Sequence, residues 1–93
     1  MVTNNIMMKL KNRGDAAKVK EMLESMMGKI DTLLEAKAYI DEGQKSSSYD
    51  ILYVSCFPDK DGQQKYVDHP VHIEVSTALS EYVETMAMVG YGE

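Results

Sequence analysis

The chain has 93 residues, enough for one small domain whose hydrophobic core is marginal on its own. Fifteen acidic and ten basic residues give a formal net charge of −5, and the lysines are dispersed, so the composition argues against a nucleic-acid partner. One cysteine, Cys56, excludes an intramolecular disulfide, and the N-terminal stretch lacks the long apolar run of a signal peptide or membrane span. We therefore expect a single cytoplasmic domain over residues 1–93 that does not contact a membrane.

The first third of the chain predicts a strand followed by a helix. Residues 4–10 place apolar side chains on one side with a period of two, which is typical of a strand. Residues 12–14 form a turn, and Asp15 is placed to cap a helix with apolar residues at helical spacing. These residues are Ala16, Val19, Met22, Leu23, Met26, Met27 and Ile30. Gly28 is expected to end this helix.

Two further strands are predicted in the middle of the chain. Residues 34–40 alternate again and indicate a second strand, and the low-complexity run at residues 44–48 predicts a loop. Residues 49–57 form the most apolar run, rich in β-branched and aromatic residues, and predict a buried third strand that Pro58 closes.

The last third predicts two helices that meet at a corner, and a closing strand. A short helix begins at Asp59 or Asp61 and ends near Asp68, because Pro70 cannot continue a preceding helix. The next helix begins at Pro70, with Asp68 or His69 as its N-cap. Its apolar arc comprises Val71, Val75, Ala78, Leu79 and Tyr82, with His72 at the edge beside Leu79. Residues 86–91 alternate and predict the final strand.

The element order βαββααβ predicts an α+β fold of ferredoxin-like kind, with an antiparallel four-stranded sheet covered by helices on one face. The strand over residues 49–57 carries apolar or aromatic side chains on both of its faces. Neither face is suited to water, so we expect two sheets to pack face to face in a homodimer.

The segment Tyr66-Val67-Asp68-His69-Pro70-Val71-His72 concentrates the groups suited to proton transfer, because it holds both histidines of the chain. His72 falls in the first turn of a helix, where the positive end of the helix dipole favours neutral imidazole. A neutral imidazole can accept a proton, so His72 is a candidate base in this segment.

Three stretches resemble a known family. They are Met8-Lys9-Leu10-Lys11, Tyr49-Asp50-Ile51-Leu52-Tyr53-Val54-Ser55 and Tyr66-x-x-His69-Pro70-x-His72. In order and spacing they are similar to the stress-responsive A/B barrel (Dabb) domains of the dimeric α/β barrel superfamily. The resemblance implies a homodimer in which two sheets form a barrel. Most members of the family have no assigned reaction.

One plant branch that resembles this pattern is a polyketide cyclase, which performs an aldol condensation without a metal or organic cofactor. Its catalytic tyrosine and histidine match Tyr66 and His72, so the resemblance implies enolisation chemistry with the histidine as base and the tyrosine steadying the enolate. Two positions depart from the family pattern. Asn4 stands where a strand-one histidine is common, and Ile30-Asp31-Thr32 replaces the usual Ile-Pro-Gly.

We expect a small apolar or aromatic ligand between sheet and helices, with Tyr66 and His72 as polar groups of the pocket. The further candidate ligand-binding residues are His69, Asn4, Met8, Tyr53 and Leu79. No cofactor is expected. Residues 68, 69 and 72 match no strong zinc spacing, so no metal site is predicted.

Several alternatives stay open from the sequence. His72 can also be a half-buried histidine that bonds to backbone, and Tyr66 can pack its ring under the following helix and anchor its hydroxyl at the corner. His69 can serve the corner by capping or by bonding a strand carbonyl. Cys56 is expected to be a packing thiol, and the eight methionines are explained by core packing and an adaptable pocket wall. The chain can thus be a dimeric binding domain, a small cofactor-independent enzyme or, by analogy with other dimeric α/β barrels, a haem-binding protein or monooxygenase.

Overall fold

The computed structural model describes residues 1–43 and 45–92. Gln44 of the expected loop and Glu93 at the end of the expected domain lie outside these ranges. The elements are β1 (Val2–Leu10), the short 3-10 helix η1 (Arg13–Asp15), α1 (Ala16–Glu24), β2 (Glu35–Ile40), β3 (Ile51–Phe57), α2 (Lys60–Asp68), α3 (Pro70–Leu79) and β4 (Val83–Gly92). The expected order βαββααβ and the α+β class are confirmed.

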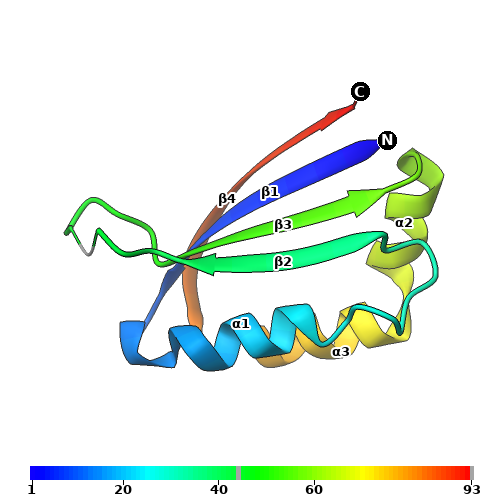
Figure 1. Cartoon of the computed structure of the whole chain (residues 1–93). Coiled ribbons are helices and arrows are strands. Elements are labelled where there is room, and N and C mark those ends of the chain that lie inside the picture. The colour runs from blue at the N-terminus through cyan, green and yellow to red at the C-terminus, as the bar shows by residue number, and fades with distance from the viewer. Residues whose placement is uncertain (44, 93) are drawn as a thin grey trace.

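The four strands form one antiparallel sheet in the order β2-β3-β1-β4. In the register, Ile6 of β1 lies beside Tyr53 of β3 and Met88 of β4, so these three side chains share one face. Figure 1 shows α1 and α3 side by side beneath that face, while the opposite face is uncovered. The two chain ends lie close together at one end of the sheet (Figure 1).

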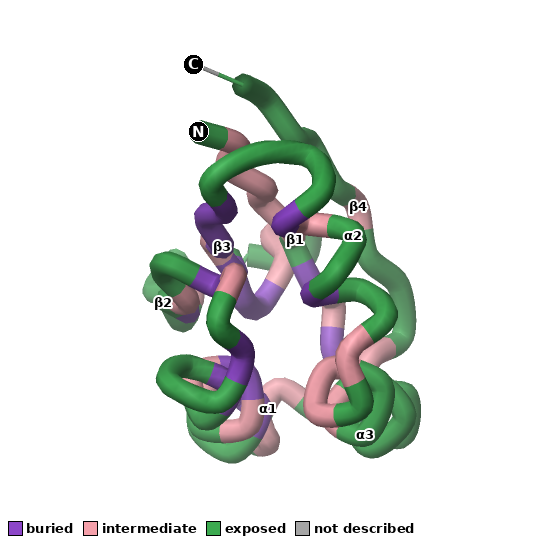
Figure 2. The backbone as a smooth tube through the Cα atoms, turned by 90° about the vertical axis from the view of Figure 1, so that its right-hand side faces the viewer, coloured by how far each residue is buried: buried purple, intermediate pink, exposed green. Residues whose placement is uncertain are grey.

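The hydrophobic core lies between the sheet and the helices. Seen along the sheet in Figure 2, the buried stretches of β1 and β3 line the space above α1 and α3. Tyr53 and Phe57 of β3 are its largest fully buried side chains, and Val19 and Leu23 of α1 pack against the sheet from below. None of the helices in the described ranges combines the length and apolarity that crossing a membrane requires.

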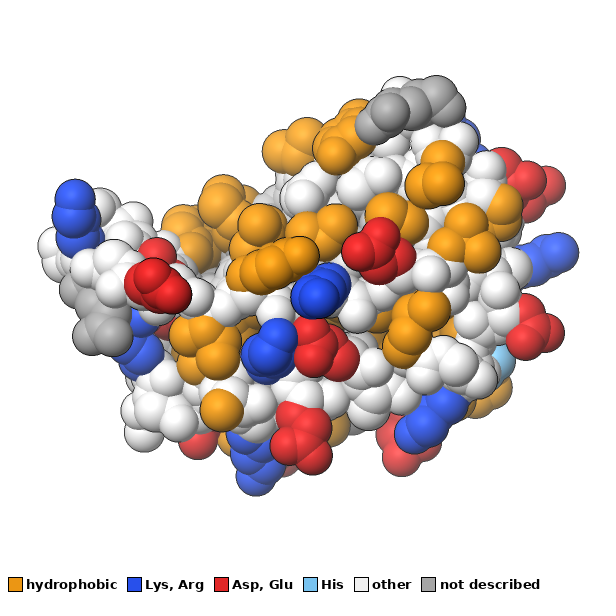
Figure 3. Space-filling model, in the orientation of Figure 1, with side chains coloured by type: hydrophobic (Ala, Val, Ile, Leu, Met, Phe, Trp, Pro, Cys, Tyr) orange, Lys and Arg blue, Asp and Glu red, His pale blue; other side chains and the backbone are white. Residues whose placement is uncertain are grey.

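The uncovered face of the sheet carries a row of apolar side chains. Tyr39, Leu52, Met7 and Ala87 lie side by side across all four strands. Tyr39, Leu52 and Met7 are partly exposed to solvent. Figure 3 shows hydrophobic side chains gathered over the sheet in the upper part of the view, with charged side chains among them.

A buried carboxylate joins three strands at the end of the sheet next to η1. Asp50 is 1% exposed, and its Oδ2 accepts a hydrogen bond of 2.7 Å from the backbone N–H of Leu10. Arg13 Nη2 lies 2.7 Å from Asp50 Oδ1 and 3.2 Å from Asp41 Oδ2. Asp50 Oδ1 has no aligned hydrogen bond, so charge attraction to Arg13, and more weakly to Lys9 Nζ at 3.8 Å, compensates this buried oxygen.

The first helix differs from the prediction at both ends. Asp15 makes no side-chain capping bond, because it belongs to η1, whose cap is the Asn12 side chain bonded to the N–H of Gly14. The regular helix ends at Glu24, and the chain then tightens into turns with hydrogen bonds between residues three apart. Gly28 adopts a positive φ of 85° as these turns end, so it does stop the helical stretch.

Other boundaries also differ from the prediction. The third strand begins at Ile51 rather than at residue 49, and the last begins at Val83, because residues 83–85 pair with the end of β1 across an irregular register. Helix α3 ends at Leu79, so Tyr82 lies beyond it, and Ala78 is exposed rather than buried.

Candidate functional site

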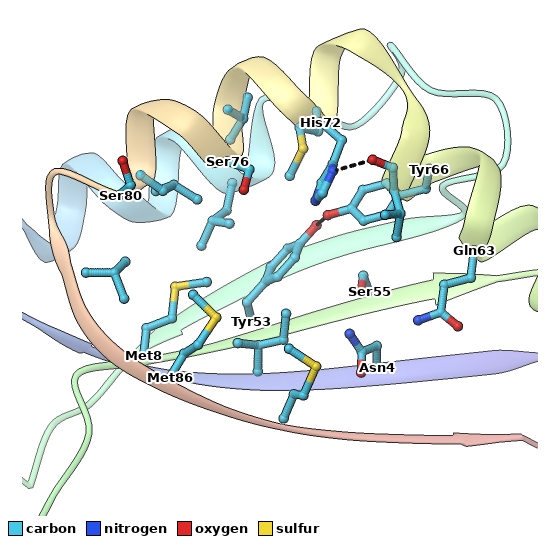
Figure 4. A pocket seen from close by; sticks show the side chains of 18 residues that line it. Asn4, Met8, Tyr53, Ser55, Gln63, Tyr66, His72, Ser76, Ser80 and Met86 are labelled. Carbon is cyan, nitrogen blue, oxygen red and sulfur yellow. Dashed lines mark hydrogen bonds between the residues drawn. The ribbon is translucent and has the colours of Figure 1, made fainter.

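A cavity of about 410 Å³ lies between the sheet and helices α2 and α3 (Figure 4). Its wall is mostly apolar and includes four methionine side chains. The lining residues are Asn4, Ile6, Met8, Leu23, Met26, Tyr53, Ser55, Gln63, Tyr66, Val67, His72, Val75, Ser76, Leu79, Ser80, Val83, Met86 and Met88. None of these described residues is an Asp, Glu, Lys or Arg, so the cavity offers polarity without a fixed charge.

Two tyrosine hydroxyls meet inside the cavity. The hydroxyl oxygen of Tyr53 on β3 lies 3.1 Å from that of Tyr66 on α2, and both residues are buried. Burial raises the pKa of Tyr53 well above its ordinary value, and the neighbouring Tyr66 raises it further. Burial also raises the pKa of Tyr66. Both phenols are therefore neutral at physiological pH and act as hydrogen-bonding groups rather than as anions.

His72 is fixed in one orientation by the corner between α2 and α3. Its Nδ1 lies 3.0 Å from the carbonyl oxygen of Val67, which can only accept, so Nδ1 carries the proton in the neutral ring. Nε2 then bears the lone pair. The imidazole also packs on the ring of Tyr66, with 4.4 Å between ring centroids. Figure 4 shows it pointing from α3 toward the two tyrosine hydroxyls.

Together the tyrosine hydroxyls and the His72 imidazole offer a bound molecule an uncharged hydrogen-bond donor and an uncharged acceptor. Only one proton is needed between the hydroxyls of Tyr53 and Tyr66, so the other hydroxyl proton is available to a bound molecule. The Nε2 lone pair of His72 can accept a proton from the same molecule. This arrangement suits a carbonyl or hydroxyl group on an apolar ligand. It also has the parts for enolisation, which needs a base and a donor to the developing oxyanion.

A second polar region lies at the end of the cavity near α2. Asn4 of β1 and Gln63 of α2 point toward this end from opposite sides, with Ser55 of β3 between them (Figure 4). In the described part of the chain, neither side-chain amide has a hydrogen-bond partner. Both amides are therefore available to a ligand, each with a donor and an acceptor.

The structure brings six of the seven candidate residues to this cavity. Tyr66 and His72 line it together with Asn4, Met8, Tyr53 and Leu79. The seventh, His69, lies outside it. The Nδ1 of His69 instead accepts a hydrogen bond of 3.1 Å from the backbone N–H of Val71 and caps α3, which was the structural alternative for this residue.

Other lining residues were not predicted from the sequence, although their spacing gives a signal. Ser76 of α3 and Ser80, the residue that caps the end of this helix, follow His72 at intervals of four and therefore extend the same side of it. Gln63 lies three residues before Tyr66 on α2. The prediction followed apolar arcs, so it passed over polar residues at the same helical spacing.

Residues 1–43 and 45–92 contain no group of three His, Cys, Asp or Glu side chains arranged to hold a metal ion. Cys56 is buried, with its Sγ 3.6 Å from the Thr3 hydroxyl and 3.8 Å from a carboxylate oxygen of Glu35.

Solved structures with the same fold are similar to the chain over nearly its whole length. A dimeric protein of unknown function from Bacteroides fragilis, with a ferredoxin-like fold, is 22% identical with a TM-score of 0.85, over 99% of this chain and 95% of that one. A Dabb family protein from Mesorhizobium loti is 16% identical with a TM-score of 0.74, over 99% and 95% of the two chains. A hydroxynitrile lyase from Passiflora edulis is 13% identical with a TM-score of 0.82, over 97% and 90%. At these identities the likeness establishes the fold.

None of the curated proteins matches the chain. The family model described as the stress responsive A/B barrel domain matches residues 2–92, which is almost the whole sequence. The resemblance seen in the three sequence stretches is therefore confirmed. The chain belongs to the stress responsive A/B barrel domain family, Dabb.

Proposed function

We propose that this protein is a homodimeric binding domain that takes a small, uncharged, apolar or aromatic molecule into the cavity between the sheet and helices α2 and α3. The observation that carries the proposal is the convergence of the Tyr53–Tyr66 hydroxyl pair and the His72 imidazole inside an otherwise apolar wall. An apolar pocket with few convergent polar groups is the usual form of a small-molecule site.

The absence of charge in the described lining argues for an uncharged ligand. A carboxylate buried there would lose its hydration without gaining a lysine or arginine partner, which is costly. A ketone or phenol can instead use the hydroxyl donor of the tyrosine pair and the acceptor on His72. Asn4 and Gln63 favour a ligand long enough to carry a second polar group at its other end.

A thermal-shift screen tests this proposal, because a ligand that binds the native state raises the melting temperature. The library pairs uncharged aromatic ketones, phenols and lactones with their carboxylate analogues and includes haem. We expect shifts from uncharged members that are lost in His72→Ala and retained in Ile73→Ala, an exposed α3 residue outside the cavity. A screen without any shift, or shifts unchanged in His72→Ala, would contradict the proposed site.

The homodimer is supported by the uncovered face of the sheet. Met7, Tyr39, Leu52, Val89 and Tyr91 lie on that face and each is at least 36% exposed. Apolar side chains gathered in this way mark an interaction surface. The Bacteroides fragilis neighbour is described as dimeric, which agrees with a second copy as the occupant.

Sedimentation of the purified protein tests the dimer independently of the cavity. Wild type should sediment with the mass of two chains, and Leu52→Lys, in the middle of the apolar row, with the mass of one. Ile73→Lys adds the same charge to an exposed apolar position on α3, so it should leave the dimer intact. A monomeric wild type, or a Leu52→Lys protein that still dimerises, would exclude this interface.

A cofactor-independent enzyme with enolisation or aldol chemistry is the second candidate. The observation that favours it is the Val67 carbonyl, which holds the proton on Nδ1 and leaves Nε2 of His72 free to act as a base. Tyr66 is then the donor that steadies the enolate oxygen. The plant neighbour is a hydroxynitrile lyase, so this fold does carry an enzyme activity in another protein.

Deuterium exchange separates binding from catalysis. A ketone that the screen identifies is incubated with protein in heavy water, and exchange at the carbon next to the carbonyl is followed by NMR. An enzyme should accelerate exchange, and His72→Ala should slow it by about 10²-fold or more, the usual contribution of a general base. Exchange no faster than in buffer would leave the binding domain as the function.

We also propose that residues 1–93 act as a single domain in the cytoplasm without a nucleic-acid or membrane partner. The support is the net charge of −5, which repels nucleic acid and anionic membranes, and the lone buried Cys56, which suits a reducing compartment.

A further inference from the structure

A second hollow, of about 340 Å³, lies between the segment that follows α1 and the corner where α2 meets α3. It is lined by Lys29, Ile30, Asp31, Thr32, Lys65 and His69, none of which lines the first cavity. Figure 1 shows the chain after α1 passing beside that corner. The two hollows therefore lie on different sides of the α2–α3 corner and are built from different side chains.

The side chains around this hollow are mainly hydrogen-bond donors. Lys29 and Lys65 are exposed, and neither ammonium group forms an ion pair in the described part of the chain. His69 uses Nδ1 to accept from the N–H of Val71, so its proton is on Nε2 and that atom can only donate. Asp31 is the single carboxylate in the lining, against two lysines.

Further polar groups in the same segment lack partners. The backbone N–H groups of Ile30, Asp31 and Thr32 have no acceptor in the described residues. The hydroxyl oxygen of Thr32 also has no hydrogen bond, but it is closed to solvent and therefore to a ligand in the hollow. A ligand with several acceptor oxygens would satisfy the backbone groups.

We infer that this hollow binds a phosphate group, either as inorganic phosphate or as the phosphate of a small monoester. Phosphate carries between one and two negative charges near neutral pH and presents oxygens to ammonium, imidazole and backbone donors. Lys65 also lies in the last turn of α2, where a cation favours the helix dipole. That role does not account for Lys29, whereas a bound phosphate would pair the ammonium groups of both lysines.

An NMR titration of the full-length protein with inorganic phosphate tests the inference, with sodium chloride at matched ionic strength as the reference. Phosphate should cause saturable shifts at the backbone amides of Ile30, Asp31 and Thr32, and leave the amide of Tyr53 in the first cavity unchanged. Repeating the titration with phenyl phosphate and glycerol phosphate shows whether a monoester binds more tightly than free phosphate.

Four variants identify the groups responsible. Lys29→Ala and Lys65→Ala should each raise the dissociation constant by about tenfold, the size of one lost charge-assisted contact. Lys60→Ala removes a lysine of the same helix outside the hollow and should change nothing. Thr32→Val keeps the side-chain shape and should leave phosphate binding unchanged, because the Thr32 hydroxyl is closed to solvent, while the melting temperature of the phosphate-free protein stays level or rises, because an unpaired buried hydroxyl is lost.

Shifts that grow linearly without saturation, or that chloride reproduces, would overturn the inference. So would a Lys65→Ala protein that binds phosphate as tightly as wild type does. These outcomes do not depend on the ligand screen or on the dimer, because the residues involved belong to neither the first cavity nor the uncovered sheet face.

Discussion

Two regions of the molecule bring polar groups together and differ in how completely these groups are paired. At the end of the sheet beside η1, Asp50 meets Arg13 and the backbone N–H of Leu10. In the cavity, the hydroxyls of Tyr53 and Tyr66 bond to each other, and His72 bonds to the backbone through one of its two ring nitrogens. In the first region, the negative charge of Asp50 is paired with the positive charge of Arg13. The second has no charge in its described lining and keeps donors and acceptors unpaired.

This difference distinguishes polar groups that stabilise the fold from polar groups that are available to a ligand. A buried charge must be compensated within the chain or the fold loses stability, so the groups around Asp50 are explained by folding alone. A neutral hydroxyl or imidazole costs much less to leave partly paired, which allows a cavity to keep such groups available for a ligand. We therefore expect substitutions at Asp50 to act on stability and substitutions at His72 to act on binding.

The largest effect is expected from Asp50→Ala. This change leaves Arg13 without its closest carboxylate and Leu10 without an acceptor for its N–H, and should lower the free energy of unfolding by about 3 to 5 kcal/mol. Urea denaturation followed by circular dichroism measures the loss. Glu84→Ala, an exposed carboxylate on β4, is the matched control and should stay within about 0.5 kcal/mol of wild type. Equal losses of unfolding free energy in the two variants would mean that the buried charge of Asp50 has no special role in stability.

The tyrosine pair should make the protein sensitive to alkali. The pKa values of Tyr53 and Tyr66 are raised in the folded state, so the unfolded chain releases these protons first, near its ordinary pKa of 10.0. Stability is therefore fully present below pH 10 and falls as the pH rises above it. Denaturation at increasing pH should show this fall, and it should be smaller in Tyr53→Phe and Tyr66→Phe.

The smallest effects on stability should distinguish the two histidines. His69→Ala removes the side-chain cap of α3 and should cost about 1 kcal/mol, the usual value of an N-cap. His72→Ala removes a solvent-exposed bond to Val67 and should cost about 0.5 kcal/mol. Thermal unfolding measures both values. A His72→Ala protein that melts far earlier than His69→Ala would mean that His72 is a structural residue.

The fold was predictable because strand alternation, the Pro70 corner and the family resemblance agree in every segment. The boundaries of the helices and strands were less predictable. Met26 and Ile30 are buried at helical spacing although α1 ends at Glu24, since periodicity reports which side chains face the core and not which carbonyl each N–H bonds. The start of β4 at Val83 depends on pairing with the end of β1, which the local sequence does not contain.

The candidate site was predictable in its residues and less so in its geometry. The spacing of Tyr66 and His72 indicated a shared pocket, and the structure places both on one cavity. The bond between Tyr53 and Tyr66 joins residues 13 positions apart on different elements, so no sequence pattern reports it. His69 was grouped with the pocket by proximity in sequence, but Pro70 turns the chain and places this side chain at the second hollow.

The most direct test of the central claim compares two probes of nearly equal shape. Hydroxyacetophenone carries an uncharged ketone where hydroxybenzoate carries a carboxylate, and calorimetry measures both on wild type and on His72→Ala. Because the described cavity lining has no charge, wild type should bind the ketone at least about tenfold more tightly than the carboxylate, and His72→Ala should bind the ketone more weakly than wild type does. Tighter binding of hydroxybenzoate, or binding of the ketone unchanged in His72→Ala, would contradict a cavity that recognises uncharged molecules through His72.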